Sequence, residues 1–421
     1  MLHAAMSDGF FARRLAEAHA RSVGIRRLLE QAGVAVEEVC TPSDLARLPV
    51  TPKEHLSAMQ REDPPFGGFL AAPLHQVKRV FMSPGPIYDV EGAEAGFWHS
   101  REALVAAGFG PGDVVINTFS YHLSPASFLV EAGLHELGAT VIPAGVGSKE
   151  QQVQVMREAG ATGYTGVPSY LLALLEEAER QVGQGRAAAP PGSDPRTGLR
   201  LRKAWFTAEK LDESLRQRLQ DVYGIDAYQG YGTAELGMLA YECVERRGMH
   251  LVDAVVVELL DPATREPVPD GTPGEVVVTS LGETYPLVRL GTGDLSSVLP
   301  GDCACGRPSP RLSGILGRVG EAVKVRGMFL YPHHLRELLS RFPELTAVHG
   351  RVDREEHRDV LHLAFAADPL PDPDRAQDLR ERIVAQAREV TRVRPDRIDF
   401  LPPDALPQGR LLEDARAWEA R

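Results

Sequence analysis

The sequence predicts an α/β protein with two domains. The chain has 421 residues, which exceeds the size at which a single hydrophobic core stops growing. Apolar segments alternate with helical patterns between residues 113 and 228, as in parallel βαβ units. We expect a large N-terminal domain over residues 1–316, with parallel sheets flanked by helices and a small β-rich subdomain over about 240–316. A small α+β C-terminal domain over 317–421 follows a glycine-bearing hinge.

The expected elements follow this division. Residues 8–60 have apolar positions at helical spacing and are expected to cover the first sheet rather than carry chemistry. The alternating region predicts strands at 113–118, 140–143, 163–166 and 201–207, and helices at 127–137, 149–159, 169–181 and 211–223. Strands at 252–260 and 275–279, with turn signals between them, predict the antiparallel subdomain. The C-terminal domain is expected to contain strands at 322–326, 360–367 and 397–401 and helices at 332–341 and 374–390.

Composition and charge exclude several classes of protein. Hydrophobic residues make up 43% and charged residues 25% of the chain, as in soluble globular proteins. The net charge of −12 argues against nucleic acid or an anionic membrane as the main partner. No apolar run is long enough to span a bilayer, and arginines interrupt the apolar residues near the N-terminus, unlike in a signal peptide. We expect an enzyme-like cytoplasmic protein.

Residues 227–235 (AYQGYGTAE) have the residue types of a nucleotide site. They overlap the end of a short predicted strand at 223–228. Gly230 and Gly232 permit close backbone approach, Tyr231 can stack on a base, and Thr233 can bind a phosphate. Glu235 can hold a divalent cation through its hard oxygen ligands. An ordinary strand-to-loop turn would use the same glycines, so this stretch alone leaves both interpretations open.

Two further segments bear on nucleotide binding. Asp294, which follows Thr292 and Gly293, can accept hydrogen bonds from two ribose hydroxyls or merely start a turn. Residues 83–92 (SPGPIYDVEG) lie between a predicted strand at 77–82 and a predicted helix at 94–107, where a phosphate loop would lie. Two prolines there remove N–H donors, no Lys or Arg is present, and Asp89 and Glu91 would repel a polyphosphate. We therefore expect nucleotide contacts from residues 231–235 and Asp294 instead.

The four cysteines are Cys40, Cys243, Cys303 and Cys305. A reducing compartment disfavours disulfides, whereas the thiolates of Cys303 and Cys305 can share a metal. Cys243 and His250 complete a possible Cys₃His set, which is a ligand composition of structural zinc sites. The spacing is unusual for such a site, and unrelated thiols with a surface histidine are the alternative. We favour zinc.

With its segments taken in chain order, the sequence resembles the phenylacetate–coenzyme A ligase family of the adenylate-forming superfamily. The resemblance extends from about residue 10 to the C-terminus. Besides Cys243 and His250, it rests on residues 138–144 (GATVIPA), 168–170 (PSY), 206–209 (FTAE), 231–235 (YGTAE), 286–289 (PLVR), 292–294 (TGD), 303–307 (CACGR), 317–318 (GR) and 326–327 (RG).

The resemblance implies an adenylation domain, a small mobile C-terminal domain and a two-step reaction. A carboxylate attacks the α-phosphate of ATP to give an acyl-adenylate and pyrophosphate, and the thiol of coenzyme A then displaces AMP. It implies that Tyr231 packs on adenine, Thr233 contacts the α-phosphate and Glu235 holds Mg²⁺. The other nucleotide contacts that it implies are Ala208, Glu209, Gly232, Asp294 and Arg318.

The resemblance also implies a substrate pocket, a metal and partners. A small, aromatic acid would lie near Tyr121, His122, Pro168 and Gly230. Structural Zn²⁺ would be bound by Cys243, His250, Cys303 and Cys305. Coenzyme A or a carrier-protein thiol would accept the acyl group, and a homodimer is possible. Neither nucleic acid nor a membrane is expected as a partner.

Two positions depart from the family pattern. The family's phosphate loop is rich in Ser, Thr and Gly and ends in Gly-Lys, unlike residues 83–92. Its catalytic lysine follows a glycine near the C-terminus, where Gly409 is followed here by Arg410. The planar fork of arginine does not reproduce an ammonium point charge, although Arg410 is expected to act as the catalytic cation. Three hypotheses remain: an AMP-forming ligase, an acyl-transfer or condensing enzyme that uses a pre-activated donor, and a non-catalytic binding protein.

Overall fold

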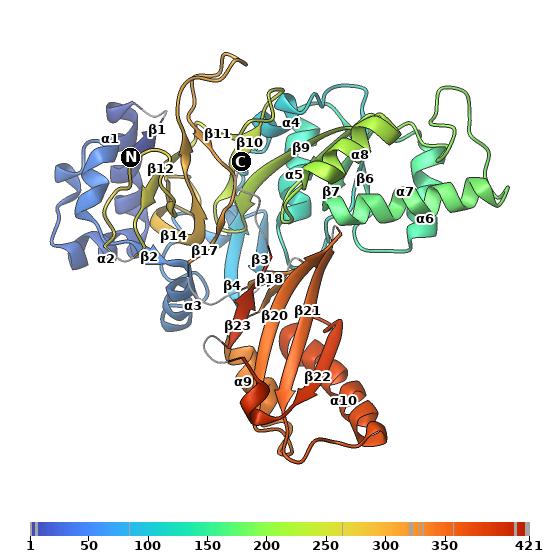
Figure 1. The fold of residues 1–421 in the computed structure, drawn as a ribbon. Helices are drawn as coiled ribbons and strands as arrows, with labels where there is room; N and C mark the ends of the chain where they lie inside the picture. The colour runs from blue at the N-terminus through green and yellow to red at the C-terminus, as the bar shows by residue number, and fades with distance from the viewer. Residues whose placement is uncertain are drawn as a thin grey trace. The chain divides into compact units, whose positions relative to one another are not determined.

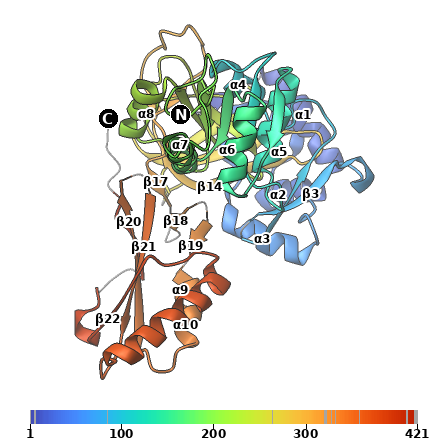
Figure 2. The same ribbon diagram turned by 90° about the vertical axis from the view of Figure 1, so that its right-hand side faces the viewer.

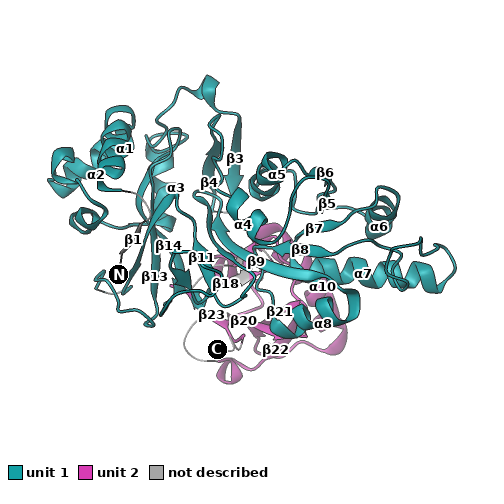
Figure 3. Cartoon of the chain, turned by 90° about the horizontal axis from the view of Figure 1, so that it is seen from above, with its two compact units in different colours: residues 1–317 teal, residues 318–421 magenta. Residues whose placement is uncertain are grey.

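The fold is described from a computed structural model. The structure describes residues 2–4, 7–83, 85–262, 264–319, 323–326, 328–330, 332–356, 358–407 and 411–416. It divides into two compact units, Met1–Gly317 and Arg318–Arg421 (Figure 3). Each unit is described by itself.

The first unit contains helices α1 to α8 and two large sheets (Figure 1). Its helices are α1 (Asp8–Arg21), α2 (Val23–Ala32), α3 (Lys53–Glu62), α4 (Arg101–Ala106), α5 (Ala126–Glu136), α6 (Lys149–Glu158), α7 (Pro168–Gly183) and α8 (Glu213–Tyr223), with 3₁₀ turns η1 (Val36–Glu38), η2 (Pro42–Arg47) and η3 (Leu74–Gln76). Its first strands are β1 (Leu2–Ala4), β2 (Thr51–Pro52), β3 (Arg79–Ser83), β4 (Ile87–Glu91), β5 (Val114–Asn117), β6 (Thr140–Pro143), β7 (Gly163–Gly166), β8 (Lys203–Phe206) and β9 (Asp226–Thr233). The later strands are β10 (Gly237–Glu242), β11 (Met249–Leu251), β12 (Val255–Leu260), β13 (Gly274–Ser280), β14 (Leu287–Ser296), β15 (Val298–Leu299) and β16 (Arg311–Leu312).

The first large sheet is half parallel and half antiparallel. Its strand order is β15-β16-β11-β10-β9-β8-β7-β5-β6. The neighbours among β5 to β9 pair in parallel, as the alternation of strands and helices predicts. Helices α5, α7 and α8 pack against these strands, and the shared core includes Tyr164, Leu171 and Phe206. From β9 onward the pairing is antiparallel, so the fold class predicted from the sequence is confirmed.

The second large sheet takes β12, β13 and β14 from the β-rich part expected after residue 235, whereas β10, β11, β15 and β16 belong to the first sheet. Its strands β1, β12, β13 and β14 are antiparallel neighbours, and β2 pairs in parallel with β14. Every residue of β12 and β13 is buried, which is typical of a sheet covered on both faces. Arg289 of the PLVR motif donates two hydrogen bonds to Glu258, at 2.9 and 2.8 Å. It also contacts the Leu48 carbonyl, so this motif residue ties the sheet together.

Three local expectations were wrong. Residues 83–92 do not connect a strand to a helix, because β3 and β4 form an antiparallel hairpin. The turn residues Gly85 and Pro86 reverse the chain there. The helix expected at 94–107 covers only α4, since Gly92 and Gly96 interrupt the start of the expected segment. The strand expected to end at Tyr228 continues as β9 to Thr233, where it pairs with β10.

The second unit is a small sheet with two helices on one face. Its elements are β18 (Val323–Val325), β19 (Met328–Leu330), α9 (Pro332–Ser340), β20 (Ala347–Glu355), β21 (Arg358–Ala366), α10 (Pro373–Thr391), β22 (Arg397–Leu401), the 3₁₀ turn η4 (Pro403–Ala405) and β23 (Leu412–Asp414). The strand order is β22-β21-β20-β23. The strand β17 (Gly317–Arg318), at the boundary, follows β14 in the second large sheet instead. Leu338 of α9 and Ile383 of α10 share a core with Leu363 of β21. Figure 2 shows both helices beside this sheet. The sequence analysis missed β20 and β23.

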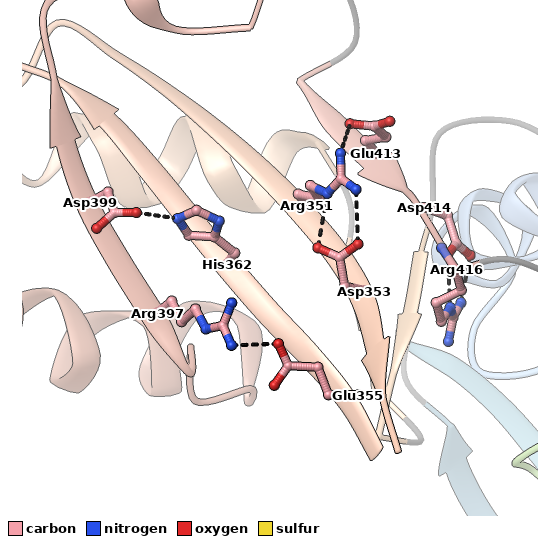
Figure 4. Close-up of polar contacts among 9 residues, drawn as sticks. All are labelled: Arg351, Asp353, Glu355, His362, Arg397, Asp399, Glu413, Asp414 and Arg416. Carbon is pink, nitrogen blue, oxygen red and sulfur yellow. Dashed lines mark hydrogen bonds and ion pairs between the residues drawn. The ribbon is translucent and has the colours of Figure 1, made fainter. Parts of the chain in front are cut away.

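The other face of that sheet carries charged side chains that pair across neighbouring strands or along one strand (Figure 4). His362 Nε2 lies 2.8 Å from Asp399 Oδ2, and Arg351 Nε donates to Asp353 Oδ2 at 2.8 Å. Exposed pairs of this kind contribute about 0–1 kcal/mol each. These ion pairs are typical of a sheet face exposed to solvent and do not indicate a binding or catalytic site. Among the residues that the structure describes, no helix has the length and hydropathy of a membrane span.

Candidate functional site

The motif at residues 231–235 lies at the end of the β9–β10 hairpin rather than in a loop. Thr233 pairs with Gly237, and Glu235 lies in the turn between the two strands. A Cβ atom on Gly232 would approach the Gly237 carbonyl oxygen to 2.6 Å, and one on Gly230 would approach the Trp205 ring to 2.5 Å. Both glycines are therefore required by close packing of β9 against its neighbours.

Tyr231 and Asp294 are brought together by the fold. The Tyr231 hydroxyl donates a hydrogen bond of 2.9 Å to Asp294 Oδ2. The Asp294 N–H donates to the Thr292 hydroxyl at 3.1 Å, which fixes the backbone in this part of β14. Two of the predicted nucleotide contacts thus form one polar group, although they belong to different sheets.

Glu235 forms a buried ion pair with Lys53, the first residue of α3. Lys53 Nζ lies 2.8 Å from Oε1 and 3.0 Å from Oε2 of Glu235. Burial alone would raise the pKa of Glu235, but the Lys53 ammonium outweighs burial and holds the pKa below its ordinary value of 4.5. The Thr233 hydroxyl acts in the same direction. Glu235 is therefore an ionised carboxylate in a dry site.

Asp89 of β4 faces the same ion pair. Its residue is 1% exposed, and neither carboxylate oxygen has a hydrogen-bond partner among the described residues. Burial and the negative charge of Glu235 raise the pKa of Asp89 well above its ordinary value, while Lys53 opposes the shift. Carboxylate oxygens are the ligands that Mg²⁺ prefers, so Glu235 and the unpartnered Asp89 fit a divalent cation.

Ala208 and Glu209 lie just after the C-terminal end of β8, which is an inner strand of the first large sheet. Ala208 has φ of 69°, a left-handed conformation that costs a residue other than glycine about 1–3 kcal/mol. Strain of this kind is concentrated at functional sites. Glu209 Oε2 accepts a hydrogen bond of 2.7 Å from the Ser169 hydroxyl, which joins the end of β8 to the start of α7.

The four predicted substrate-pocket residues do not form one cluster of contacts. The Tyr121 hydroxyl donates to Glu131 and accepts from Asn117 Nδ2 at 2.9 Å. His122 is exposed, whereas Pro168 is buried as the first residue of α7. Gly230 packs between Trp205 and Met238. The ring of Phe128 lies beside both Tyr121 and Phe81, with centroid distances of 5.3 and 5.4 Å, so Tyr121 belongs to a small group of aromatic side chains.

A cavity of about 770 Å³ reaches the wall formed by Glu235 and Leu236. Other parts of its wall come from α1, from residues 94–99 and from residues 280–283 and 285. None of the four predicted pocket residues lines it. The cavity therefore reaches residue Glu235 from the side of α1, although the Glu235 side chain itself is fully buried.

The predicted zinc ligands converge in space. The ligand atoms of Cys243, His250, Cys303 and Cys305 all lie within 4.8 Å of one another. Cys243 Sγ is 3.6 Å from Cys303 Sγ, and Cys305 Sγ is 3.3 Å from His250 Nε2. Tetrahedral zinc with Zn–S bonds of about 2.3 Å separates sulfur atoms by about 3.8 Å. The spacing fits zinc.

The surroundings of the Cys/His cluster also suit a metal. His250 Nδ1 lies 3.0 Å from the Ser309 carbonyl oxygen, the arrangement that turns the other ring nitrogen toward a metal. Burial opposes ionisation of Cys305, but hydrogen bonds from Arg307 outweigh it and lower the Cys305 pKa to about 7. The thiolate is the form that binds metal.

The two remaining predicted residues belong to the C-terminal part of the chain. Arg318 is the half-buried first residue of the second unit, and its predicted ribose contact stays a prediction. Arg410 lies outside the described residues. Its predicted catalytic role stays a prediction.

Sequence reasoning missed Lys53 and Asp89. Lys53 belongs to the segment that was expected only to cover the sheet, and Asp89 was interpreted as a charge that repels phosphate. The one local signal for Lys53 is its position directly after Thr51-Pro52, where a helix begins. No local signal indicates that Asp89 is buried beside Glu235.

The fold and these residues define an AMP-binding enzyme of the adenylate-forming type. The model of the AMP-binding enzyme family matches residues 94–283. The phenylacetate-coenzyme A ligase of Thermus thermophilus is 30% identical to this chain. The alignment covers 96% of this chain and 93% of the ligase. The ligase of Escherichia coli is 32% identical over 80% of this chain and 76% of its own length. The chain belongs to the phenylacetate–coenzyme A ligase family.

The fold is also that of a solved ligase. The crystal structure of 2-hydroxyisobutyryl-CoA ligase, in complex with 2-HIB-AMP and CoA, has a TM-score of 0.82. The alignment covers 97% of this chain and 90% of that chain at 24% identity. This likeness concerns the fold alone.

Proposed function

We propose that this protein is an AMP-forming acyl- or aryl-CoA ligase. It activates a small carboxylic acid as an acyl-adenylate and passes the acyl group to coenzyme A or to another thiol. The observation that carries the proposal is family membership over nearly the full length, with 30% identity to a phenylacetate-coenzyme A ligase. The bonded pair of Tyr231 and Asp294 and the ionised Glu235 supply the groups that an adenylate needs.

Each of these residues has a role in the proposed reaction. The Tyr231 ring packs on adenine, and Asp294 accepts hydrogen bonds from the ribose. Gly232, Ala208 and Glu209 lie along the nucleotide, and Thr233 contacts the α-phosphate. Glu235 holds Mg²⁺, which supplies positive charge to the phosphate oxygens when ATP is bound. Arg318 completes the ribose contacts, and Arg410 stabilises charge during transfer.

The proposed substrate is an aromatic acid. The Phe128 ring, which lies beside both Tyr121 and Phe81, suits an aromatic group, because aromatic pairs prefer stacked or edge-on contacts. His122, Pro168 and Gly230 are proposed to complete the pocket. The relatives from Thermus thermophilus and Escherichia coli are phenylacetate-coenzyme A ligases by name.

Zinc is proposed as a structural cofactor. Cys243, His250, Cys303 and Cys305 supply four protein ligands, which leave no open position for a catalytic water. All four cysteines of the chain are unpaired, which suits thiolate chemistry in a reducing cytoplasm. A carrier-protein thiol as acceptor and a homodimer belong to the same proposal.

ATP–pyrophosphate exchange over a panel of aromatic and short aliphatic acids tests the function. The proposal expects acid-dependent exchange and, with coenzyme A present, release of AMP and an acyl thioester. Arg410→Lys should keep exchange and Arg410→Ala should reduce it, since adenylation requires a cation near the transferred carboxylate. Absence of exchange with every acid, for all three proteins, would contradict the proposal.

A second candidate function is acyl transfer from a pre-activated donor. The observation that favours it is the composition of residues 83–92, which contain no Lys or Arg to bind a polyphosphate. Under this alternative, Arg410→Lys and Arg410→Ala have no effect, and the protein transfers acyl groups from an acyl thioester without ATP. Transfer without AMP release would identify this function.

A further inference from the structure

Asp89 is a buried carboxyl group that the protein itself leaves without a hydrogen-bond partner. It is 1% exposed, and both its oxygens lack a partner within the described part of the chain. The nearby Ser83 hydroxyl acts to lower the Asp89 pKa, but it donates its hydrogen bond to the Ile87 carbonyl oxygen at 3.3 Å. Buried polar groups are nearly always bonded, and an exception indicates a missing water, proton or ion.

The position of Asp89 is held by α3. Gln60 Nε2 donates to the Tyr88 carbonyl at 2.8 Å, and Gln60 Oε1 accepts from the Tyr88 N–H at 2.7 Å. Gln60 Nε2 also donates to the Tyr285 hydroxyl at 3.1 Å. The strand residue next to Asp89 is thus fixed to the helix that begins with Lys53. Asp89, Lys53 and Glu235 are consequently positioned by rigid contacts, as a binding site requires.

The charges around Asp89 do not balance. Lys53 is the cation that acts on both Asp89 and Glu235, and its ammonium already contacts both oxygens of Glu235. Glu91, on the same hairpin, shows the contrast. It is also buried, but it lies 2.7 Å from Arg79 Nη1 and 3.8 Å from Lys78 Nζ. The hairpin therefore neutralises the buried carboxylate of Glu91 with its own cations. It leaves the carboxylate of Asp89 available to a ligand.

We infer that Asp89 and Glu235 are two carboxylate ligands of one divalent-cation site, with Asp89 supplied by the hairpin that replaces the phosphate loop. Hard cations such as Mg²⁺ bind carboxylate oxygens and keep several waters. The inference rests on the proposed function for its purpose: the cation brings the positive charge that the hairpin lacks.

Direct binding of Mn²⁺ tests the inference without any catalytic assay. Full-length, zinc-loaded protein is titrated with Mn²⁺, and free Mn²⁺ is followed by electron paramagnetic resonance. Asp89→Asn should weaken Mn²⁺ binding by at least about tenfold, as loss of a metal-site residue commonly does. The matched control is Glu91→Gln on the same strand, which should stay within about twofold of wild type.

Lys53→Met gives a second result of opposite sign. Because its ammonium competes for Glu235, this variant should bind Mn²⁺ more tightly than wild type. Thermal unfolding with and without Mg²⁺ is the second readout: Mg²⁺ should raise the Tm of wild type and of Glu91→Gln, but not of Asp89→Asn.

The outcomes separate the inference from the function. Equal Mn²⁺ affinity for wild type and Asp89→Asn overturns the inference even if pyrophosphate exchange is normal. Absence of Mn²⁺ binding by wild type overturns it too. Asp89-dependent binding in a protein that shows no exchange supports the cation site and removes the ligase proposal.

Discussion

The Tyr231 hydroxyl and the Asp294 carboxylate are joined by a hydrogen bond of 2.9 Å between residues 63 positions apart in the chain. Tyr231 belongs to β9 of the mixed sheet and Asp294 to β14 of the antiparallel sheet. The bond fixes the orientation of the carboxylate before any nucleotide arrives. Preorganisation of this kind reduces the ordering cost of binding.

Tyr231→Phe should therefore weaken AMP binding while leaving the aromatic ring in place. A hydrogen bond to a charged group contributes about 1.5–3 kcal/mol, so affinity should fall by roughly tenfold or more. Calorimetric titration with AMP measures this. The control is Tyr241→Phe on the adjacent β10, whose hydroxyl instead lies 3.4 Å from Glu102. Equal losses in both variants would show that the Tyr231–Asp294 bond has no special role.

Cys303→Ser should lower the thermal stability of the protein through loss of zinc. A hundredfold loss of affinity removes about 2.7 kcal/mol of the stability that bound metal provides. Metal analysis should find about one zinc per chain in wild type, as four protein ligands imply. The exposed Cys40 lies outside the cluster, so Cys40→Ser should keep both the zinc and the Tm. Wild-type protein purified without zinc would contradict the prediction.

Glu242→Ala should destabilise the first unit strongly. Glu242 accepts hydrogen bonds from Arg216 at 3.0 and 2.8 Å, and both side chains are 4% exposed. Removing one partner of a buried pair leaves an uncompensated charge and costs about 3–5 kcal/mol. Denaturant unfolding measures the change. Asp353→Ala, which breaks the exposed Arg351–Asp353 pair (Figure 4), should cost less than about 1 kcal/mol.

His99 should make stability depend on pH. Burial lowers its pKa below the ordinary value of 6.5, although Glu94 opposes the shift. Since the folded state disfavours the charged ring, stability is complete above pH 6.5 and is lost as the pH falls toward the folded pKa. His99 has φ of 55°, and asparagine tolerates this conformation. The difference in unfolding free energy between wild type and His99→Asn should therefore decrease from pH 7.5 to 5; a flat difference would contradict it.

The sequence predicted those features of the site that depend on residue type and chain order. Glycines at 230 and 232, a hydroxyl at 233 and a carboxylate at 235 indicated a nucleotide motif. Three cysteines and a histidine indicated a metal cluster. Alternating apolar segments predicted the parallel part of the sheet, because hydrophobic periodicity reports local structure directly. The strand β20 was missed because neither its apolar nor its charged residues produce a regular alternation.

Only the tertiary structure decided which of these residues meet. Lys53 and Glu235 are 182 positions apart, and no local pattern predicts that an ammonium from α3 contacts the turn after β9. Asp89 appeared in the sequence as a charge on a loop, whereas packing of the β3–β4 hairpin against α3 buries it beside Glu235. The physical reason is that burial and charge balance depend on contacts between distant segments, and these set the protonation and ligand capacity of a carboxyl group.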